Sequence, residues 1–423
     1  MKIVFIQNRP LFPANTGGKI RTLNILRHLA RWHEITYLCN SHAGDETHFS
    51  KMRDLGLRFE AVPRRELRWG SPRFFATMAR NLASSLPFNV AKHFDPKVRA
   101  RARTLLAQER YDLIICDFLQ TALHGVDLNG PPSILFQHNV EAQILRRHAE
   151  TSSGWLKRRY LSMQWQRMRR FEAAMGRKFD AVIAVSAQDR AIFERDYGWQ
   201  HVHAIDTSVD TDYFQPAPVP EDDSRVLFLG SMDWLPNREG VKHFVRHVWP
   251  LVRKEHPRAV FEIVGRNPSP EILAMGSVEG VEVVGTVDDV RPYLARSAVV
   301  VVPLLVGGGT RLKIFEAMAM DKAVVSTAIG CEGLPVAAGK HLLVEDTPVG
   351  FAQAVCSLMA SNEQRRKLAA AGRTLVCESY GTEPVAGQFD AVCRATAGAA
   401  KESADAKHCR AEQAPEDRHC TVG

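Results

Sequence analysis

The stretch AVVVVPLLVGGGTRLKIFEAMAMDKAVVST (298–327) predicts the fold of this chain. An apolar run at 298–304 leads into a glycine-rich loop, a helical pattern at 310–320 and a second apolar run at 323–327. Two apolar runs joined by a helix are typical of neighbouring strands in a parallel sheet. Strands that are apolar almost throughout are buried on both faces, because helices cover both sides of such a sheet. The stretch therefore indicates a doubly wound α/β domain.

The same alternation of apolar runs and helical stretches extends over most of the chain. The earlier runs are KIVFIQN (2–8), EITYLC (34–39), DLIICD (112–117), SILFQHN (133–139), DAVIAVS (180–186), RVLFLGS (225–231), VFEIVG (260–265) and VEVVG (281–285). The segment PAPVPEDD (216–223) interrupts the series with prolines and acids, which is the composition of a linker. We therefore expect two Rossmann-like, doubly wound parallel-sheet domains, at 1–215 and 225–380, joined by a linker at 216–224.

The overall composition is that of a globular protein with an anionic partner. Of 423 residues, 45% are hydrophobic and 24% are charged, which is ordinary for folded domains. The net charge of +8 favours a nucleotide, a lipid head group or nucleic acid, and charge alone does not choose among them. Eight scattered cysteines suggest reduced thiols, and the first ten residues are too polar for a signal peptide. No apolar run reaches the length of a spanning helix, so we expect a cytoplasmic protein.

The C-terminal residues 397–423 are small or charged and offer almost nothing to bury, so we expect a disordered tail. Two His-Cys pairs lie in this tail, His408-Cys409 and His419-Cys420. Their spacing fits no zinc signature, and we interpret them as incidental. Asp288 and Asp289 are adjacent, so their side chains point in different directions. A helix N-terminus therefore explains these two residues better than a metal-binding pair does. We therefore expect no metal and no cofactor.

The glycine loop at 307–309 has the chemistry of a phosphate site. Glycines let the backbone approach a ligand closely, and the free N–H groups of a helix start favour phosphate oxygens. Arg311 and Lys313 add positive charge, and Glu316, three residues after Lys313, suits hydrogen bonds to ribose hydroxyls. An ordinary glycine turn before an amphipathic helix would show the same residues, and such motifs occur often by chance.

A resemblance favours the phosphate site. The segment GGGTRLKIFEAMAMDKAVVSTAIGCEGL (307–334) resembles the donor site of family 4 glycosyltransferases, retaining enzymes whose two Rossmann-like domains face each other across a cleft, the GT-B fold. Similar motifs in the same order are PANTGGKIRTLNILRHLA (13–30), FQHNVE (136–141), IAVSAQD (183–189), FLGSMDWLPN (228–237), FEIVGRNP (261–268) and VEVVGTVDDVRPYLARSAVVVVPL (281–304). The resemblance covers residues 2 to 395 and is most specific in the second half. It also implies a helix at 381–396 that returns to the first domain.

In the C-terminal domain the resemblance implies a donor site. Glu316 matches the glutamate that binds the donor ribose, and Arg311 and Lys313 lie where they would stabilise the departing diphosphate. The loop and helix start Gly308, Gly309 and Thr310, together with Asn237 and Arg238 after the first strand, complete the expected donor-binding set. Many relatives carry an earlier glutamate that is separated from the one at Glu316 by seven residues, and Gly308 stands there in this chain. The sequence therefore does not predict which sugar is transferred.

In the N-terminal domain, Gly17 and Gly18 match the loop that closes over donor and acceptor, although they could simply begin the following helix. His138 matches a histidine that faces the cleft near the transferred sugar, although a strand-end histidine is ordinarily a satisfied core residue. A P-loop is excluded, because Ile20 stands where Ser or Thr should follow Lys19. Asp117, also at a strand end, receives no role.

Two segments, 65–81 and 152–178, interleave aromatic side chains with Arg and Lys. Helices of this kind lie on anionic membrane surfaces, and a core helix with a solvated basic face is an equal alternative. A nucleic-acid partner is disfavoured, since no binding motif accompanies the charge.

The resemblance therefore implies a retaining hexosyltransferase that needs no metal. It would move a sugar from a nucleotide-diphosphate donor to a glycan or lipid-linked acceptor, in cell-envelope or exopolysaccharide synthesis, peripheral to the inner face of the plasma membrane. A sugar-nucleotide epimerase or phosphorylase on the same fold, or an inactive nucleotide- or glycan-binding protein, remains an alternative.

Overall fold

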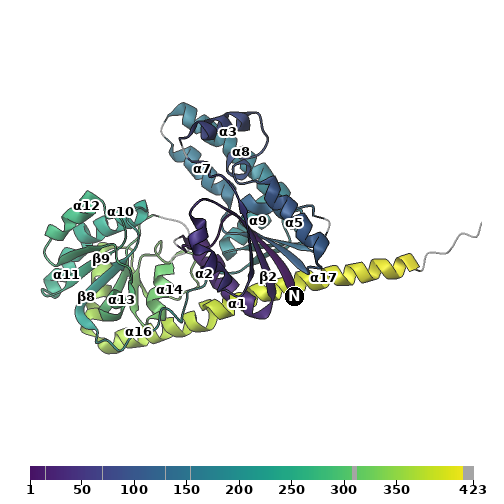
Figure 1. Cartoon of the computed structure of the whole chain (residues 1–423). Coiled ribbons are helices and arrows are strands. Elements are labelled where there is room, and N and C mark those ends of the chain that lie inside the picture. The colour runs from purple at the N-terminus through teal and green to yellow at the C-terminus, as the bar shows by residue number, and fades with distance from the viewer. Residues whose placement is uncertain (15, 69, 129, 153, 307–311, 413–423) are drawn as a thin grey trace, which may run out of the picture. The chain divides into compact units, whose positions relative to one another are not determined.

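The computed structural model describes residues 1–412, apart from 15, 69, 129, 153 and 307–311, and it divides into two compact units. The first unit comprises Met1–Asp206 and Ala386–Gly423, and the second comprises Thr207–Val385 (Figure 1). Each unit is a parallel sheet with helices on both faces, so the doubly wound α/β class is confirmed. No helix among the described residues is long and apolar enough to cross a membrane.

The first unit contains a seven-stranded sheet in the order β3-β2-β1-β4-β5-β6-β7. Its strands are β1 (Lys2–Gln7), β2 (Glu34–Ser41), β3 (Arg58–Pro63), β4 (Leu113–Asp117), β5 (Ser133–Gln137), β6 (Ala181–Ala184) and β7 (Val202–Ala204). The helices are α1 (Gly17–Trp32), η1 (Asp45–His48), α2 (Phe49–Arg53), α3 (Pro72–Leu82), α4 (Phe88–Ala91), α5 (Pro96–Gln108), η2 (Leu119–Thr121), α6 (Ala122–Gly125), α7 (Glu141–Thr151), α8 (Trp155–Gly176) and α9 (Ala187–Tyr197). The strand order reverses between β1 and β4.

The second unit contains a six-stranded sheet in the order β10-β9-β8-β11-β12-β13. Its strands are β8 (Asp222–Leu229), β9 (Val260–Val264), β10 (Val281–Gly285), β11 (Ser297–Val302), β12 (Ala323–Ser326) and β13 (Leu343–Val344). The helices are α10 (Leu235–His243), η3 (Phe244–Val248), α11 (Trp249–Glu255), α12 (Pro270–Leu273), η4 (Ala274–Ser277), α13 (Arg291–Arg296), α14 (Leu312–Ala319), α15 (Pro348–Ala360), α16 (Asn362–Leu375) and η5 (Val376–Tyr380). The six residues of β11 are all buried, as its apolar sequence predicts.

The boundary between the units falls at Asp206/Thr207, earlier than the proline-rich segment. The last residues of that segment are ordered by charge. The Lys322 ammonium donates to Glu221 at 2.7 Å, and the buried Arg365 pairs with both Glu221 and Asp223. Two buried cations need nearby carboxylates. The acidic residues whose composition suggested a linker therefore pair with these cations, and β8 begins among them at Asp222.

Helix α17 (Thr382–Glu412) passes from the second unit to the first at Ala386. Within the first unit, the Phe389 ring packs edge-on against Phe136 with centroids 5.1 Å apart, and Asp390 bonds the His33 ring at 2.5 Å. The helix continues to Glu412, where the composition predicts disorder from 397. Ala, Glu and Lys dominate this stretch, and they are strong helix formers.

Glu172 ties three helices of the first unit together. Its buried carboxylate accepts from the backbone N–H groups of Glu141 at 3.0 Å and Ala142 at 3.1 Å, which begin α7. The Tyr197 hydroxyl at the end of α9 donates to the same carboxylate at 2.8 Å. Burial raises the pKa of Glu172 to about 8, although these donors oppose the shift. One side chain of α8 thus caps α7 and anchors α9.

Gly176, at the end of α8, provides a test of the packing. A methyl group there would lie 2.0 Å from the ring of the buried Trp199. We expect Gly176→Ala to destabilise the first unit by about 1–3 kcal/mol, because the indole is rigid and enclosed. Gly387→Ala in α17 is the matched control, since its methyl group meets no atom within 4 Å and alanine favours a helix. In urea unfolding, the midpoint concentration should be lower for Gly176→Ala than for the natural protein, and it should not be lower for Gly387→Ala. Equal midpoints for the two variants would contradict this packing.

Candidate functional site

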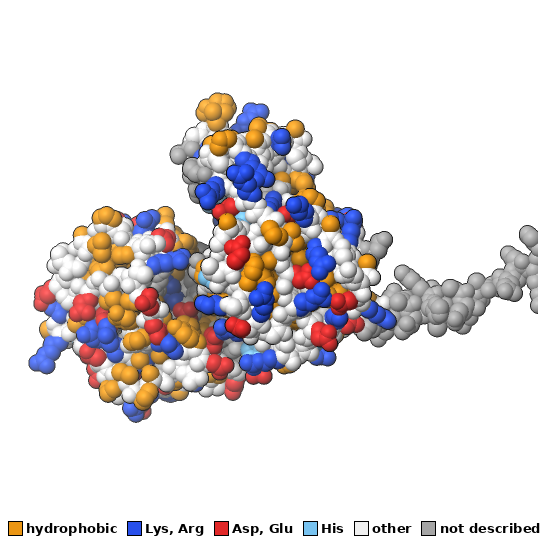
Figure 2. Space-filling view, in the orientation of Figure 1, with side chains coloured by type: hydrophobic (Ala, Val, Ile, Leu, Met, Phe, Trp, Pro, Cys, Tyr) orange, Lys and Arg blue, Asp and Glu red, His pale blue; other side chains and the backbone are white. Residues whose placement is uncertain are grey.

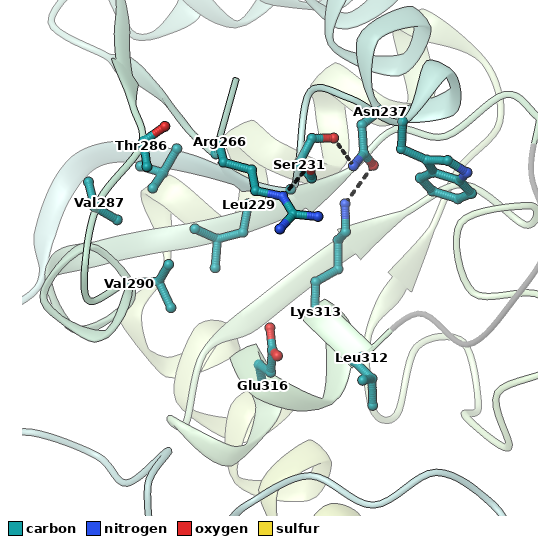
Figure 3. A pocket seen from close by; sticks show the side chains of 14 residues that line it. Leu229, Ser231, Asn237, Arg266, Thr286, Val287, Val290, Leu312, Lys313 and Glu316 are labelled. Carbon is teal, nitrogen blue, oxygen red and sulfur yellow. Dashed lines mark hydrogen bonds between the residues drawn. The ribbon is translucent and has the colours of Figure 1, made fainter. Parts of the chain in front are cut away.

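A pocket of about 460 Å³ lies in the second unit, at the carboxyl ends of β8 and β9 and beside the start of α14 (Figure 3). It is lined by Leu229, Gly230, Ser231, Trp234, Asn237, Val264, Gly265, Arg266, Thr286, Val287, Val290, Leu312, Lys313 and Glu316. The strand order of this sheet reverses between β8 and β11. Open parallel sheets bind ligands at such a reversal, outside the carboxyl ends of the strands.

Lys313 projects from the first turn of α14 into this pocket, and Asn237 fixes its position. The Lys313 ammonium donates to the Asn237 side-chain oxygen at 2.8 Å and lies 4.4 Å from the centroid of the Phe228 ring. The Asn237 amide donates in turn to the Ser231 carbonyl at 2.7 Å, which fixes which end of the amide faces the lysine (Figure 3). The ammonium is therefore held at the pocket wall by two neutral groups.

Two glycines at the strand ends make this arrangement possible. A side-chain carbon on Gly265 would lie 1.8 Å from the Gly230 carbonyl oxygen. One on Gly230 would lie 2.6 Å from both the Asn237 amide nitrogen and the Lys313 ammonium. Any larger residue at either position would displace the lysine or separate the strands, so glycine is required by close approach rather than by backbone conformation.

Glu316 lies one turn after Lys313 on the same helix and lines the same pocket (Figure 3). Burial raises the pKa of its carboxyl group to about 7, and the Lys313 charge partly opposes this. The group is therefore poised between its neutral and ionised forms near neutral pH. A ligand that donates hydrogen bonds to it would favour the ionised form.

Arg266 forms another wall of the pocket. Its guanidinium donates to the Ser231 hydroxyl at 3.0 Å and pairs with Asp233 at 3.4 Å. Apolar side chains complete the lining, chiefly Val287 and Val290. The pocket thus combines cations, one carboxyl group and an apolar surface. A ligand with an anionic group, hydroxyls and a flat apolar ring would match all three.

The structure brings three of the expected donor residues together, namely Asn237, Lys313 and Glu316. Arg238 does not line the pocket, and its charge instead acts on Glu271 of α12. Gly308, Gly309, Thr310 and Arg311 lie outside the described residues. Arg266, Ser231 and Trp234 were missed, although FLGSMDWLPN and FEIVGRNP contain them, because the sequence does not show which side chains face inward.

A second polar network lies in the first unit, at the reversal between β1 and β4. The His138 ring, just after β5, bonds the Asp117 carboxylate at 2.5 Å through Nε2. The other Asp117 oxygen accepts from the Thr22 hydroxyl at 2.7 Å and from the Gln7 amide. Asp117 is fully buried and His138 is 4% exposed. A buried carboxylate with three donors is satisfied, and it holds the histidine in one orientation.

Arg21 of α1 sets the protonation of this histidine. Its guanidinium lies 3.1 Å from Nδ1 of His138. Because a guanidinium only donates, Nδ1 accepts, and the ring proton is on Nε2, facing Asp117. Burial lowers the pKa of His138, Asp117 opposes this, and Arg21 lowers it further. The imidazole is therefore neutral, with both nitrogens engaged.

Phe118 links this network to the glycines of α1. Its ring stacks on His138 with centroids 3.8 Å apart, and a side-chain carbon on Gly18 would lie 2.4 Å from the Phe118 ring. Phe118 has a φ of 70°, a conformation that costs a bulky residue energy. No neighbour within 4 Å restricts Gly17 in this way. The structure thus brings Gly18 and His138 together through a residue that the sequence did not single out.

Among the described residues, no group of three or more His, Cys, Asp or Glu side chains is arranged to hold a metal ion.

Two family models match the chain, one for each half. The model described as Glycosyltransferase Family 4 matches residues 16–213, and the model described as Glycosyl transferases group 1 matches residues 223–361. A curated relative from Klebsiella pneumoniae, described as an uncharacterized 44.6 kDa protein in the cps region, is 22% identical over 301 residues. That match covers 68% of this chain and 76% of the relative.

Solved structures share the fold over nearly the whole chain. Anabaena Alr3699/HepE, solved in complex with UDP-glucose, superposes with a TM-score of 0.62 at 15% identity, covering 93% of this chain and 100% of that one. WaaG, described as a glycosyltransferase involved in lipopolysaccharide biosynthesis, gives a TM-score of 0.58 at 15% identity, covering 91% and 98%. At these identities the likeness shows the fold.

The raised pKa of Glu316 predicts how stability depends on pH. Its folded pKa of about 7 lies above the unfolded value of about 4.3, so the folded state binds the proton more tightly and ionisation destabilises it. The free energy of unfolding should therefore decrease as the pH rises from 4 to 7. Glu316→Gln cannot ionise, so at pH 8 it should be more stable than the natural protein by about 1–3 kcal/mol. Thermal melting measures this, and near pH 4 the two proteins should melt together. An equal difference at both pH values would refute the assignment.

Proposed function

Because the chain belongs to the family 4 glycosyltransferases, we propose that it is a retaining enzyme that transfers a hexosyl group from a nucleotide-diphosphate sugar. The donor nucleotide binds in the pocket of the second unit, and the acceptor is a hydroxyl group of a glycan or a lipid-linked glycan. The observation that carries this proposal is the meeting of Lys313, Asn237 and Glu316 in one pocket, at the strand-order reversal. Asn237 comes from one motif of the donor-site resemblance, and Lys313 and Glu316 come from another.

The pocket offers one feature for each part of a nucleotide diphosphate. The Lys313 ammonium, held by Asn237, faces the diphosphate. Glu316, ionised, accepts hydrogen bonds from the ribose hydroxyls. The apolar wall at Val287 and Val290 accepts a flat base. The structures of HepE with UDP and with UDP-glucose support a uracil nucleotide as the first candidate.

In the transfer, the bond between the anomeric carbon and the diphosphate oxygen breaks, and the acceptor oxygen bonds that carbon on the same face. The acceptor proton passes to the departing phosphate. Negative charge gathers on the diphosphate as it leaves, so Lys313, Arg311 and the N-terminal end of α14 stabilise the transition state more than the bound donor. This electrostatic role needs no metal ion.

His138 contributes as a positioning residue in this proposal. Its Nδ1 is engaged by Arg21 and its Nε2 by Asp117, so no ring nitrogen is free to take the acceptor proton. The neutral ring, stacked beneath Phe118, fixes the surface at the carboxyl ends of β4 and β5. The match to a Klebsiella pneumoniae protein of the cps region supports a role in polysaccharide biosynthesis.

A thermal-shift panel tests the donor site. UDP, GDP and ADP, with their sugars, are added to the natural protein and to Glu316→Ala. We expect one nucleotide family to raise the melting temperature of the natural protein, by an amount that grows with concentration. The shift should vanish in Glu316→Ala, because the ribose contact is lost. If no nucleotide shifts the natural protein, the proposed donor class is wrong.

Two variants separate donor binding from transfer. Lys313→Ala should lower turnover by about 10²- to 10³-fold, because it removes charge that stabilises the leaving diphosphate. His138→Ala should also lower turnover, but it should leave the UDP-induced shift intact, because the nucleotide pocket lies wholly within the second unit. Lys340→Ala, an exposed lysine of the second unit, is the control and should change neither. Normal turnover in Lys313→Ala would refute its role.

A further inference from the structure

Helices α3, α7 and α8 form a projecting layer of the first unit (Figure 1). Helix α8 has 22 residues, and its buried residues begin only at Gln164. Its first turns therefore extend beyond the core. The end of α3 is fastened to the middle of α8, where the Gln164 amide donates to the Asn81 side chain at 3.0 Å and the Arg167 guanidinium donates to the Asn81 and Leu82 carbonyls. The layer is thus a rigid support.

This layer exposes large apolar side chains on both α3 and α8. Trp155 and Leu156, the first residues of α8, are 72% and 65% exposed. On α3, Phe75 is 52% exposed and Leu82 is 54% exposed. Exposed apolar side chains gathered in one region mark an interaction surface, because leaving them in water forgoes the free energy of burial.

The same layer carries more positive charge than the whole chain. The segments 64–82 and 144–170 contain thirteen Lys and Arg against two acids, Glu66 and Glu150. The formal charge of the full chain is +8, so the rest of the chain is slightly acidic. Figure 2 shows Lys and Arg side chains over these helices, with apolar side chains at the outer end. The basic character of the protein therefore comes from this layer rather than from the nucleotide pocket.

The charges at the start of α8 directly follow its apolar residues. Lys157, Arg158 and Arg159 are exposed, and within the described part of the chain no ion pair joins them to a carboxylate. Along α3, Arg73 and Arg80 lie on the face opposite Phe75 and Leu82, since seven residues make two helical turns. Helix α3 is thus amphipathic at its exposed part, and the start of α8 places its cations beside its exposed apolar side chains.

We propose that this surface, the basic tip formed by residues 155–159 with the exposed face of α3, docks on a bilayer that contains anionic phospholipid. Trp155 and Leu156 enter at head-group level, where tryptophan is favoured. Lys157, Arg158 and Arg159 contact lipid phosphates while their aliphatic stems cover apolar surface. The proposal goes beyond the transfer reaction, and it places the enzyme where a lipid-linked acceptor would be found.

Vesicle flotation of the full chain tests the proposal. Vesicles of phosphatidylglycerol and phosphatidylcholine should carry the protein upward, and vesicles of phosphatidylcholine alone should bind it at least tenfold more weakly. Trp155→Ser/Leu156→Ser and, separately, Arg158→Glu/Arg159→Glu should each weaken binding to the anionic vesicles at least tenfold. These side chains are exposed, so melting temperatures should stay unchanged and loss of binding would not reflect unfolding.

The matched controls lie on the second unit. Leu273→Ser removes a leucine that is 53% exposed, and Arg366→Glu/Lys367→Glu reverses two exposed charges of α16, so both variants should float like the natural protein. Trp155→Leu keeps an apolar residue at the tip and should still bind, but it should lose the quenching of fluorescence by brominated lipid. Equal binding to neutral vesicles, no binding to anionic ones, or unchanged binding of the tip variants would overturn the proposal. None of these outcomes bears on nucleotide binding, which the thermal-shift panel measures without lipid.

Discussion

The second unit is organised around the placement of one ammonium group. Lys313 keeps its charge at the pocket wall because Asn237 offers an oxygen and Phe228 offers the face of its ring. Neither of these two partners is a carboxylate, and the Lys313 charge also acts on the carboxyl group of Glu316. The close approach of Gly230 to Gly265 leaves the space that this arrangement occupies. A carboxylate in the place of Asn237 would hold the lysine more tightly, but it would repel a diphosphate.

The first unit also has polar side chains at its strand-order reversal, but there they bond one another. Its reversal point also gathers polar side chains from strand ends, but there Asp117 is fully satisfied and the His138 ring is engaged on both nitrogens. Buried networks of this kind are rigid, because breaking one bond leaves an unpaired buried group. The same topology thus places a lysine at a pocket wall in one sheet and a closed, orienting network in the other. Topology places a site, and the side chains determine what it does.

Local sequence predicts the strands well, because strands buried on both faces must be apolar. It also predicts Asn237, Lys313 and Glu316, whose positions follow from short motifs at strand ends. The His138 network could not be found this way, since Thr22, Asp117 and Arg21 meet only through pairings about a hundred residues apart. The pairing of Glu221 and Asp223 with buried cations could not be predicted from local sequence for a related reason. Their buried partners, Lys322 and Arg365, lie far along the chain, so only the linker-like composition was visible.

The location of the basic residues distinguishes two explanations of the positive net charge, a nucleotide ligand and an anionic surface, which composition alone does not distinguish. A basic pI is compatible with binding a nucleotide, but a nucleotide pocket needs only one or two cations at defined positions. The described pocket carries Lys313 and Arg266, and Arg266 is already paired with Asp233. The excess positive charge lies instead on a helical layer of the first unit that ends in exposed Trp155 and Leu156. Charge spread over a broad surface beside apolar side chains suits a partner that is itself broad, anionic and apolar beneath its surface. A bilayer has these properties, and a small anion does not.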